Sequence, residues 1–355
     1  MALITLDFET YYSREYTLNK MTTEQYIRDP QFQVIGFAYR IDHGDPVWAT
    51  GDDDRIAMAL KALDLDNHSL VAHNAAFDAA ILSWRYGIHP KNIFDTLSMA
   101  RPITGMTVGV SLAALAKKFC LGEKGTEVVN ALGLRREQFS PEQLAAYGQY
   151  CINDVVLTHN LFYILSQYST VQEMYIIDMM LRMFTDPVVE LNRHLLKVHL
   201  TDVQTRKAKL LDKIDQSVGR DELMSNPKFA SILVKLGVSP PMKVSVATGK
   251  ETYAFSKTDQ AFKDLLEHPD ERVQAVVAAR LGIKSTLEET RTESFIGISE
   301  RGRLPIMLNY YGANTTGRAC LTGDTTITVM RKGFMQDIRL DELENDDFVW
   351  DGTGF

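Results

Sequence analysis

The chain has 355 residues, 45% of them hydrophobic and 24% charged, and its formal net charge is −8. This composition is typical of a globular protein of two or three domains, and the negative charge offers no overall basic field for binding duplex nucleic acid. No apolar run approaches the roughly 18 residues of a membrane-spanning helix. A signal peptide is not expected, because the first residues carry no basic region and Asp7 interrupts their apolar run. The three scattered cysteines are too few for a disulfide framework or a zinc site, so a cytoplasmic protein with no membrane partner is expected.

The first part of the chain alternates strand-like and helix-like segments. Predicted strands are Leu3–Phe8, Gln33–Ile41, Val47–Thr50, Ser69–His73 and Ile93–Thr96. Predicted helices are Asp54–Leu63, Asp78–Tyr86, Ser111–Phe119 and one that begins with Ser140 as N-cap and Pro141 as its first residue. The apolar run Val155–Leu165 continues this last helix or starts another. Such alternation predicts an α/β domain around a mixed sheet, here residues 1–168.

Four carboxylates fall at informative places in this domain. Asp7 and Glu9 share one face of a strand, because side chains at i and i+2 point the same way. Asp78 follows a later strand, and Asp154 lies in a helical segment, one turn after Tyr150. Clustered carboxylates stay ionised when cations lie among them. The pattern therefore predicts a two-metal site for phosphodiester hydrolysis.

The order and spacing of these residues resemble the DEDD family of 3′→5′ exonucleases. Asp7 and Glu9 match its first motif, Asn74 and Asp78 its second, and Tyr150 with Asp154 its third. Gln149 stands where the histidine subfamily carries its histidine, so the tyrosine form (DEDDy) fits better. The resemblance implies a ribonuclease-H-like fold and a site with two divalent ions, Mg²⁺ or Mn²⁺.

The resemblance also implies a role for each site residue. Asp7 would bridge both ions, while Glu9 and Asp154 would hold the ion that activates water and Asp78 would reach the other through water. Tyr150 would orient the nucleophilic water.

Residues beside the acids have both functional and structural interpretations. Asn74 is expected to contact the substrate backbone. Tyr11 and Tyr12 are equally compatible with stacking on a terminal base and with packing. Tyr147 is a weaker rival of Tyr150 and is expected to be packed.

Three further residues near the motifs have structural roles in our interpretation. Phe8 is expected to fill the core from the opposite face of its strand. His73 is interpreted as a hydrogen-bonded structural histidine, and Asp95 as a helix cap rather than a metal ligand.

From residue 169 the character of the sequence changes. Predicted helices are Met174–Arg182, Leu195–Asp215, Asp259–Leu266 and Glu271–Ala279. The segment Ala279–Thr286 resembles the thumb of family A DNA polymerases, in which Arg280, Lys284, Ser285 and Thr286 would grip phosphates of primer-template DNA. Asn309–Arg318 resembles the Thr-Gly-Arg entry to the palm, with Arg318 as a phosphate contact. Residues 169–319 are thus expected to be a partial, mostly helical polymerase region.

The last segment resembles something different. Cys320-Leu321-Thr322-Gly323-Asp324-Thr325 with a β-branched strand after it looks like the first splicing block of an intein. Cys320 would attack the carbonyl of Ala319 and convert the amide into a thioester. Residues 320–355 contain three basic and eight acidic residues, a net charge of −5, which suits association with a basic C-terminal piece. A polymerase loop with a chance cysteine is the alternative, and a naturally split or a truncated intein would look the same.

Together these features predict the N-terminal part of a phage-like family A DNA polymerase. It would comprise an exonuclease domain, an incomplete thumb and palm entry, and a short β-rich N-intein. The expected partners are single-stranded or frayed 3′ DNA ends, primer-template DNA and a C-terminal split-intein/polymerase polypeptide. The palm acids are absent, so primer extension is not expected. Three alternatives are a stand-alone DEDD exoribonuclease, a catalytically silent nucleic-acid-binding module and a chain that serves mainly as a splicing precursor.

Overall fold

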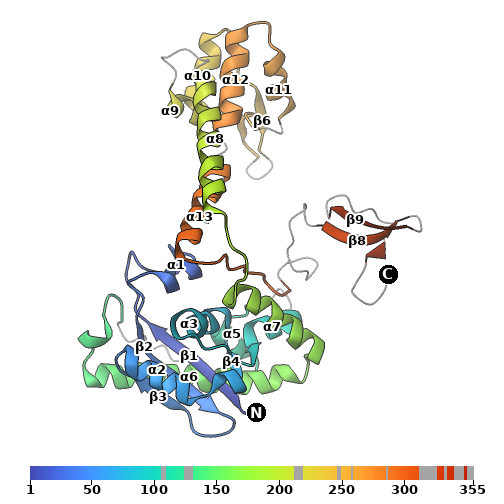
Figure 1. Ribbon diagram of the computed structural model, residues 1–355. Helices are drawn as coiled ribbons and strands as arrows, with labels where there is room; N and C mark the ends of the chain where they lie inside the picture. Colours follow the sequence, from blue (N-terminus) through green and yellow to red (C-terminus); the bar gives the residue numbers. More distant parts are fainter. Residues whose placement is uncertain are drawn as a thin grey trace. The chain divides into compact units, whose positions relative to one another are not determined.

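A computed structural model describes most of the chain (Figure 1). The described residues are 1–104, 109–123, 131–211, 219–245, 249–256, 259–284, 287–311, 326–331, 334–339 and 348–349, with only the backbone at 210, 211, 220, 283, 284, 287 and from 326 onward. The chain forms two compact units: unit 1 comprises Met1–Val188 and Pro305–Phe355, and unit 2 comprises Val189–Leu304.

Unit 1 is built on a five-stranded mixed sheet with the strand order β3-β2-β1-β4-β5. The strands are β1 (Leu3–Thr10), β2 (Val34–Ile41), β3 (Val47–Thr50), β4 (Ser69–Ala72) and β5 (Asn92–Asp95). β1 pairs antiparallel with β2 and parallel with β4, so it lies in the middle of the sheet (Figure 1). The first predicted strand is therefore the central one, held on both edges by backbone hydrogen bonds.

Helices surround this sheet. They are α1 (Thr23–Arg28), α2 (Asp53–Ala62), α3 (Ala76–Tyr86), α4 (Thr96–Thr104), α5 (Leu112–Lys118), α6 (Pro141–Ser166) and α7 (Val171–Thr185). The predicted caps are confirmed: Ser111 accepts a hydrogen bond from the backbone of Ala114, and Ser140 forms a capping box with Gln143 ahead of Pro141. α6 continues without a break to Ser166, which resolves the alternative that the sequence left open.

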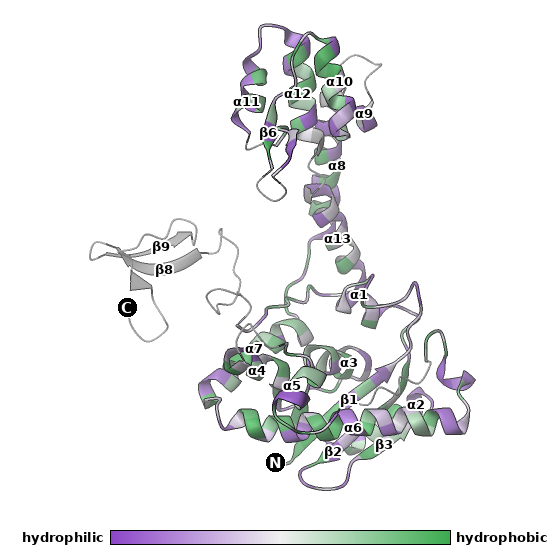
Figure 2. Ribbon diagram, turned by 180° about the vertical axis from the view of Figure 1, so that it is seen from behind, coloured by the Kyte–Doolittle hydropathy of each residue, from purple (hydrophilic) through white to green (hydrophobic). Residues whose placement is uncertain are grey.

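The two faces of β1 have different neighbours. Phe8 is buried and its ring lies 5.5 Å from that of Phe37, its cross-strand partner, in the main core of unit 1. This confirms the core position predicted for Phe8. Asp7 pairs with Ala38, which packs on the other face against Cys151 of α6. Alternation along the strand thus directs the acids toward α6. Figure 2 shows apolar residues, in green, gathered in this sheet.

Two glycines allow α6 to approach the sheet. The indole of Trp48 on β3 lies so close to Gly36 of β2 and Gly148 of α6 that a Cβ would come within 2.4 Å and 2.6 Å of it, respectively. Real Cβ contacts are not that short, so both positions require glycine in this packing. Trp48 therefore fixes the position of α6, the helix that carries Tyr147 to Asp154, above β2 and β3.

Unit 2 has its own small core. Its elements are α8 (Arg193–Leu211), α9 (Arg220–Met224), α10 (Asn226–Lys235), β6 (Met242–Val244), β7 (Glu251–Tyr253), α11 (Gln260–Lys263), α12 (Glu271–Lys284) and α13 (Leu287–Arg301). The side chains of Phe229, Phe255 and Phe262 pack edge-on or tilted at the centre. α8 packs along α13, where Lys207 and Glu289 form an ion pair of 2.5 Å. This unit is mostly helical, as the sequence indicates.

The division of the chain differs from the predicted boundary at residue 168. α7 belongs to unit 1, because Ile177, Leu181 and Phe184 are buried in the core around the sheet and Asp178 accepts a 2.7 Å hydrogen bond from the backbone of Ile93. Amphipathic spacing identifies such a helix but does not say which core covers its apolar face.

A three-stranded antiparallel sheet lies near the end of the chain, with the strand order β10-β8-β9. Its strands are β8 (Thr326–Arg331), β9 (Phe334–Arg339) and β10 (Phe348–Val349).

None of the helices in the described part of the chain is both long enough and apolar enough to cross a bilayer.

A buried histidine beneath β1 gives the fold a predictable pH dependence. His159 of α6 is 1% exposed, its Nδ1 lies 2.9 Å from Oγ1 of Thr5, and burial, with the charges of Arg40 and His43, lowers its pKa to about 4. In the unfolded chain the imidazole of His159 binds a proton near pH 6.5, whereas in the folded chain it stays neutral down to about pH 4. The contribution of neutral His159 to the free energy of unfolding is therefore fully present above pH 6.5 and is lost as the pH falls toward 4. We expect the melting temperature of His159→Gln to fall less steeply over this window than that of the unmodified chain. Equal slopes in thermal melts would contradict this role.

Candidate metal-dependent nuclease site

β1 presents two half-buried carboxylates on the face that α6 covers. Asp7 and Glu9 lie opposite Ala38 and Gly36 of β2, and the register shifts immediately after Glu9. Such an irregularity interrupts the regular hydrogen-bonded pairing of β1 with β2 and changes the direction of the side chains next to it. The two acids are thus held by the central strand of the sheet, which is paired on both edges.

Asp78 adds a third carboxylate from the first turn of α3. It is 3% exposed, and its Oδ1 accepts a 3.1 Å hydrogen bond from the backbone N–H of Phe8. Burial and the neighbouring charge of Asp7 raise its pKa well above the usual range for an aspartate. Two carboxylates this close to each other disfavour double ionisation unless a cation lies between them. The structure therefore brings Asp78 to Asp7.

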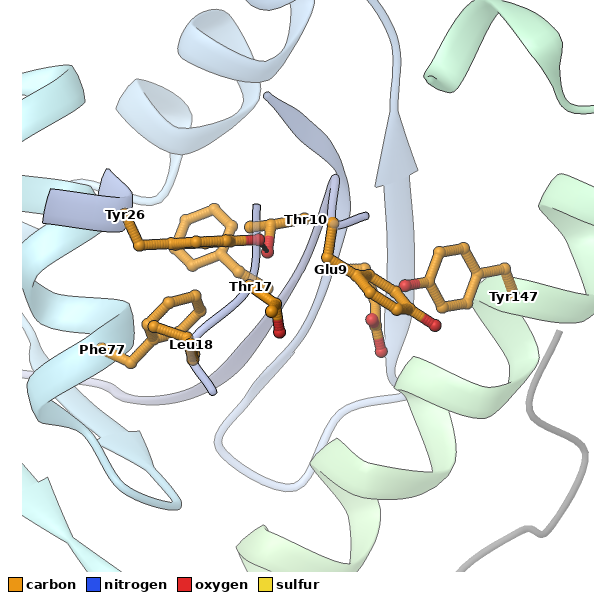
Figure 3. Close-up of a pocket in the computed structure, with 9 residues that line it drawn as sticks. Glu9, Thr10, Thr17, Leu18, Tyr26, Phe77 and Tyr147 are labelled. Carbon is orange, nitrogen blue, oxygen red and sulfur yellow. Dashed lines mark hydrogen bonds between the residues drawn. The ribbon is translucent and has the colours of Figure 1, made fainter. Parts of the chain in front are cut away.

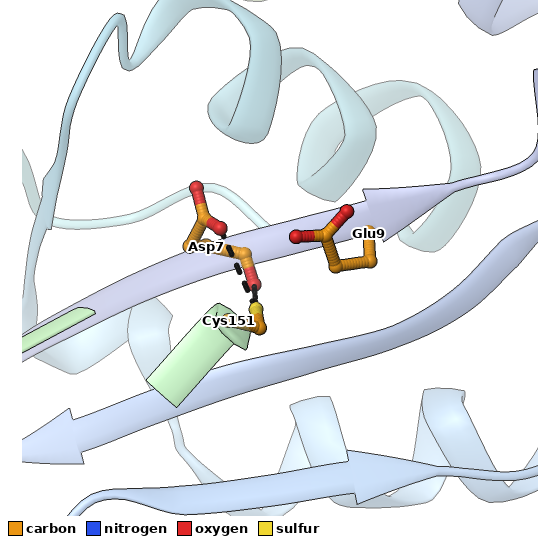
Figure 4. A group of neighbouring side chains, drawn as sticks. All are labelled: Asp7, Glu9 and Cys151. Carbon is orange, nitrogen blue, oxygen red and sulfur yellow. Dashed lines mark hydrogen bonds between the residues drawn. The ribbon is translucent and has the colours of Figure 1, made fainter. Parts of the chain in front are cut away.

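α6 contributes Cys151 and Asp154 from above the strand. The Sγ of Cys151 lies 3.3 Å from the backbone oxygen of Asp7 and 3.4 Å from its Oδ2 (Figure 4). One ligand atom from each of Asp7, Glu9 and Cys151 lies within 4.8 Å of the others. Asp154 is buried one turn after Cys151, on the same side of the helix. Sequence reasoning missed Cys151, although its i, i+3 spacing to Asp154 is a usable signal.

Tyr147 is linked to a predicted ligand. Its phenol is hydrogen-bonded to Glu9, and burial, together with the charge of Glu9, raises its pKa. Its ring stacks on Phe139 with centroids 5.7 Å apart. The predicted packing of Tyr147 is thus observed, with a polar contact that the sequence did not reveal. Tyr150 is half-buried beside this aromatic group, one turn before Asp154.

A pocket of about 230 Å³ opens beside Glu9 (Figure 3). Glu9 and Tyr147 lie at one end of it and Tyr26 and Phe77 at the other. The lining residues are Phe8, Glu9, Thr10, Tyr12, Thr17, Leu18, Tyr26, Phe77 and Tyr147. The pocket thus places aromatic side chains beside the carboxylate of Glu9.

The two tyrosines that follow β1 have different positions. Tyr12 lines the pocket, and burial with the charge of Glu9 raises its pKa. Tyr11 instead stacks on Tyr16 with ring centroids 5.8 Å apart, and the guanidinium of Arg135 lies 3.9 Å from its ring centre. Tyr12 thus borders the pocket, whereas the ring of Tyr11 contacts Tyr16 and Arg135.

The second motif forms a constrained turn. Asn74 is exposed and has φ 67°, a left-handed conformation that asparagine adopts more readily than most residues. Oδ1 of Asp95 accepts hydrogen bonds from the backbone of Asn74 (2.8 Å) and Ala75 (3.1 Å), and its Oδ2 accepts one from Ser98 (3.1 Å). Asp95 therefore caps α4, as predicted, and supports the turn as well. Nδ1 of His73 lies 2.8 Å from the hydroxyl of Thr96, which confirms a hydrogen-bonded histidine.

The predicted DNA contacts of unit 2 are not assembled in the described part of the chain. Arg280 is fully buried, its guanidinium donates to the backbone oxygen of Leu223 and to Oδ1 of Asn226, and it lies 4.4 Å from the ring centre of Phe229. Its position is a correction to the predicted phosphate contact, because a basic residue at helical spacing points inward as readily as outward. The side chain of Lys284 and all of Ser285, Thr286, Arg318, Ala319 and Cys320 lie outside the described residues.

The donor set fits divalent metal ions. Asp7, Glu9, Asp78 and Asp154 would supply hard oxygen ligands, which Mg²⁺ and Mn²⁺ prefer. Burial, and after it the charge of Asp7, raise the pKa of Asp78, and a bound cation would offset both effects.

Comparisons with known proteins agree with this geometry. Residues 43–168 match the family model described as 3′-5′ exonuclease. No curated protein matches the sequence. Among solved structures, the POL domain of Pol1 from M. smegmatis, in complex with DNA primer-template and dNTP, has 16% identity and a TM-score of 0.52, covering 90% of this chain and half (50%) of that chain. NrnC from Brucella melitensis with bound Mg²⁺ has 17% identity and a TM-score of 0.36, covering 49% of this chain and 79% of that one.

The fold is an α/β domain with a central mixed sheet, and acidic side chains gather on its central strand and at the start of α3. More particularly, residues 43–168 resemble a 3′-5′ exonuclease domain, a family whose members typically use divalent metal ions. The matched residues begin after β1, so Asp7 and Glu9 are identified by motif and geometry rather than by the family model.

Proposed function

We propose that unit 1 removes nucleotides from the 3′ ends of single-stranded or frayed DNA by two-metal hydrolysis. The observation that carries this proposal is the gathering of Asp7, Glu9 and Asp78 at the end of β1, with Asp154 buried on the helix above them. When bound, two Mg²⁺ or Mn²⁺ ions would activate a water and stabilise the charge that develops on the phosphate. Asp7 would bridge the ions, Glu9 and Asp154 would hold the ion nearest the water, and Asp78 would act through bound water.

The pocket supports a role in holding the terminal nucleotide. Tyr12 and Phe77 offer aromatic surface for the base, next to the carboxylate of Glu9. Stacking of this kind is insensitive to sequence, which suits an enzyme that must remove any nucleotide. The exposed side chain of Asn74, held in a fixed turn by Asp95, would contact the substrate backbone.

The two tyrosines of α6 are expected to have separable effects. Tyr147→Phe removes the hydrogen bond to Glu9 and should raise the Mg²⁺ concentration for half-maximal activity by roughly tenfold or more, the usual effect of losing a partner of a metal ligand. Tyr150→Phe should lower kcat and leave the Mg²⁺ requirement unchanged, because in our assignment it orients water. Mg²⁺ titrations of both variants test this. An unchanged Mg²⁺ requirement in Tyr147→Phe would contradict the proposed role of Tyr147 in positioning Glu9.

The direct test of the function is digestion of end-labelled oligonucleotides by the purified chain. We expect stepwise shortening from the 3′ end with Mg²⁺ or Mn²⁺ and no product in EDTA. Comparing DNA with RNA of the same sequence distinguishes this function from that of an exoribonuclease. Binding without digestion under every metal condition would instead support a silent binding module.

We further propose that this domain is part of a family A DNA polymerase of phage-like type. The fold likeness to the polymerase structure extends over most of the chain, and unit 2 is helical as a thumb would be. A chain of residues 1–355 should not extend a primer on a template with deoxynucleotides, because in our assignment the palm acids that bind the polymerising ions belong to the polypeptide joined after Ala319. Template-directed synthesis by this chain, free of host polymerase, would contradict the domain assignment.

We also propose that residues 320–355 are an N-intein that joins the chain to the rest of the polymerase by trans-splicing after Ala319. The cysteine motif of the sequence supports this, and the strands β8 and β9 form a hairpin of the kind expected downstream of it. The alternative is that the chain acts mainly as a splicing precursor.

A further inference from the structure

A buried thiol lies within the cluster of predicted metal ligands. Cys151 is fully buried, and its Sγ is 3.4 Å from Oδ2 of Asp7, the carboxylate that we place between the two ions. A carboxylate oxygen of Glu9 completes a group of three ligand atoms within 4.8 Å of one another (Figure 4). The centre of this nuclease therefore combines one sulfur with its oxygen donors.

The spacing suits tetrahedral coordination. With metal–sulfur and metal–oxygen distances of about 2.3 Å and 2.1 Å, the S···O edge of a tetrahedral site is about 3.6 Å. The observed Cys151–Asp7 separation of 3.4 Å is close to that edge, so these two ligands need little rearrangement. The Glu9 oxygen must approach by about an ångström, a movement that rotation of its longer side chain permits.

The kind of ion follows from the donors. Mg²⁺ takes oxygen ligands in an octahedral shell and has little affinity for sulfur. Zn²⁺, Cd²⁺ and Co²⁺ accept a thiolate together with carboxylates. Independent of the cysteine, residues 43–168, which include Cys151 but not Asp7 or Glu9, match an exonuclease family whose members typically use divalent ions. The same acids can thus serve two classes of ion, and Cys151 discriminates between them.

We propose that Cys151, Asp7 and Glu9 form a mixed sulfur–oxygen site that binds a thiophilic divalent ion of the Zn²⁺ class and so displaces the catalytic Mg²⁺. On binding, the Sγ–H bond breaks, its proton passes to solvent and an Sγ–metal bond forms. With Mg²⁺ the thiol keeps its proton and donates to Asp7. The inference rests on the proposed function in one respect, that Asp7 and Glu9 are the Mg²⁺ ligands.

Cobalt provides a readout that does not depend on catalysis, since a thiolate bound to Co²⁺ gives a charge-transfer band in the near ultraviolet. The chain also contains Cys120, which is exposed, and Cys320, so Co²⁺ is titrated into the full chain carrying Cys120→Ser and Cys320→Ser. We expect a saturable band in this background. It should be absent after Cys151→Ser, which preserves size and a donor to Asp7, and after Asp7→Asn. No band in the background chain, or a band that survives Cys151→Ser, would overturn the site.

Competition measured with Mg²⁺-dependent digestion separates this inference from the function itself. Each variant is normalised to its own rate in Mg²⁺ alone, and the Zn²⁺ concentration for half-inhibition should rise by at least about tenfold in Cys151→Ser. Digestion by the background chain without any cobalt–thiolate band would refute the mixed site and leave the nuclease proposal standing. A band without any digestion would refute the nuclease proposal and leave the mixed site standing.

Discussion

Asp7→Asn is expected to lower the rate of 3′→5′ digestion by at least about a thousandfold, which corresponds to about 4 kcal/mol of transition-state stabilisation. The substitution keeps the size of the side chain and removes the charge that, in our assignment, binds both ions. β1 is paired on both edges and its apolar face is unchanged, so the fold should persist. Rates on a labelled single-stranded oligonucleotide at saturating Mg²⁺ measure the effect.

Thermal melts show whether Asp7→Asn loses activity because metal binding is lost or because the protein no longer folds. Removing the charge of Asp7 relieves its repulsion of Asp78, so the variant in EDTA should melt no lower than the unmodified chain. Added Mn²⁺ should raise the melting temperature of the unmodified chain and have little effect on the variant. Asp45→Asn, at an exposed turn, is the matched control and should behave as the unmodified chain. Digestion by Asp7→Asn at the rate of this control would refute the site assignment.

Cys320→Ala is expected to abolish protein ligation completely. When the chain is mixed with a matching C-terminal intein piece fused to the remaining polymerase, it should lose residues 320–355 and form a longer product joined at Ala319. The thiol of Cys320 forms the new C–S bond while the Ala319–Cys320 C–N bond breaks and the nitrogen takes the proton. Alanine supplies no nucleophile, so mass spectrometry should find no ligated product.

Association of the two pieces provides the control for this result. Residues 320–355 carry a net charge of −5, and attraction to a basic partner does not require the thiol. Cys320→Ala should therefore bind the C-terminal piece as the unmodified chain does, and association of both should slow as salt rises. Ligation by Cys320→Ala, or binding without ligation by the unmodified chain, would refute the splicing proposal.

The sequence by itself determined the strands of the sheet, the helices α2, α3, α5 and α6, and the acids of β1, but it did not reveal α1. These features depend on local rules: alternation fixes which face of a strand Asp7 and Glu9 share, and Ser140-Pro141 fixes where α6 starts. The position of Phe8 in the core and the capping role of Asp95 follow from the same rules. Local physical chemistry was sufficient wherever a residue acts within its own element.

Only the tertiary structure decided which distant residues meet. It brought Cys151 to Asp7, joined Tyr147 to Glu9, formed the pocket from Tyr12, Leu18 and Phe77, and assigned α7 to unit 1. Each of these contacts depends on how helices and strands pack against one another. The packing of Trp48 against Gly36 and Gly148, which sets the position of α6, is an example. Packing also decided the position of Arg280: the sequence predicted a surface residue that contacts phosphate, but its side chain is buried and donates to the backbone oxygen of Leu223. Periodicity specifies the face of a helix, but long-range packing selects what that face contacts.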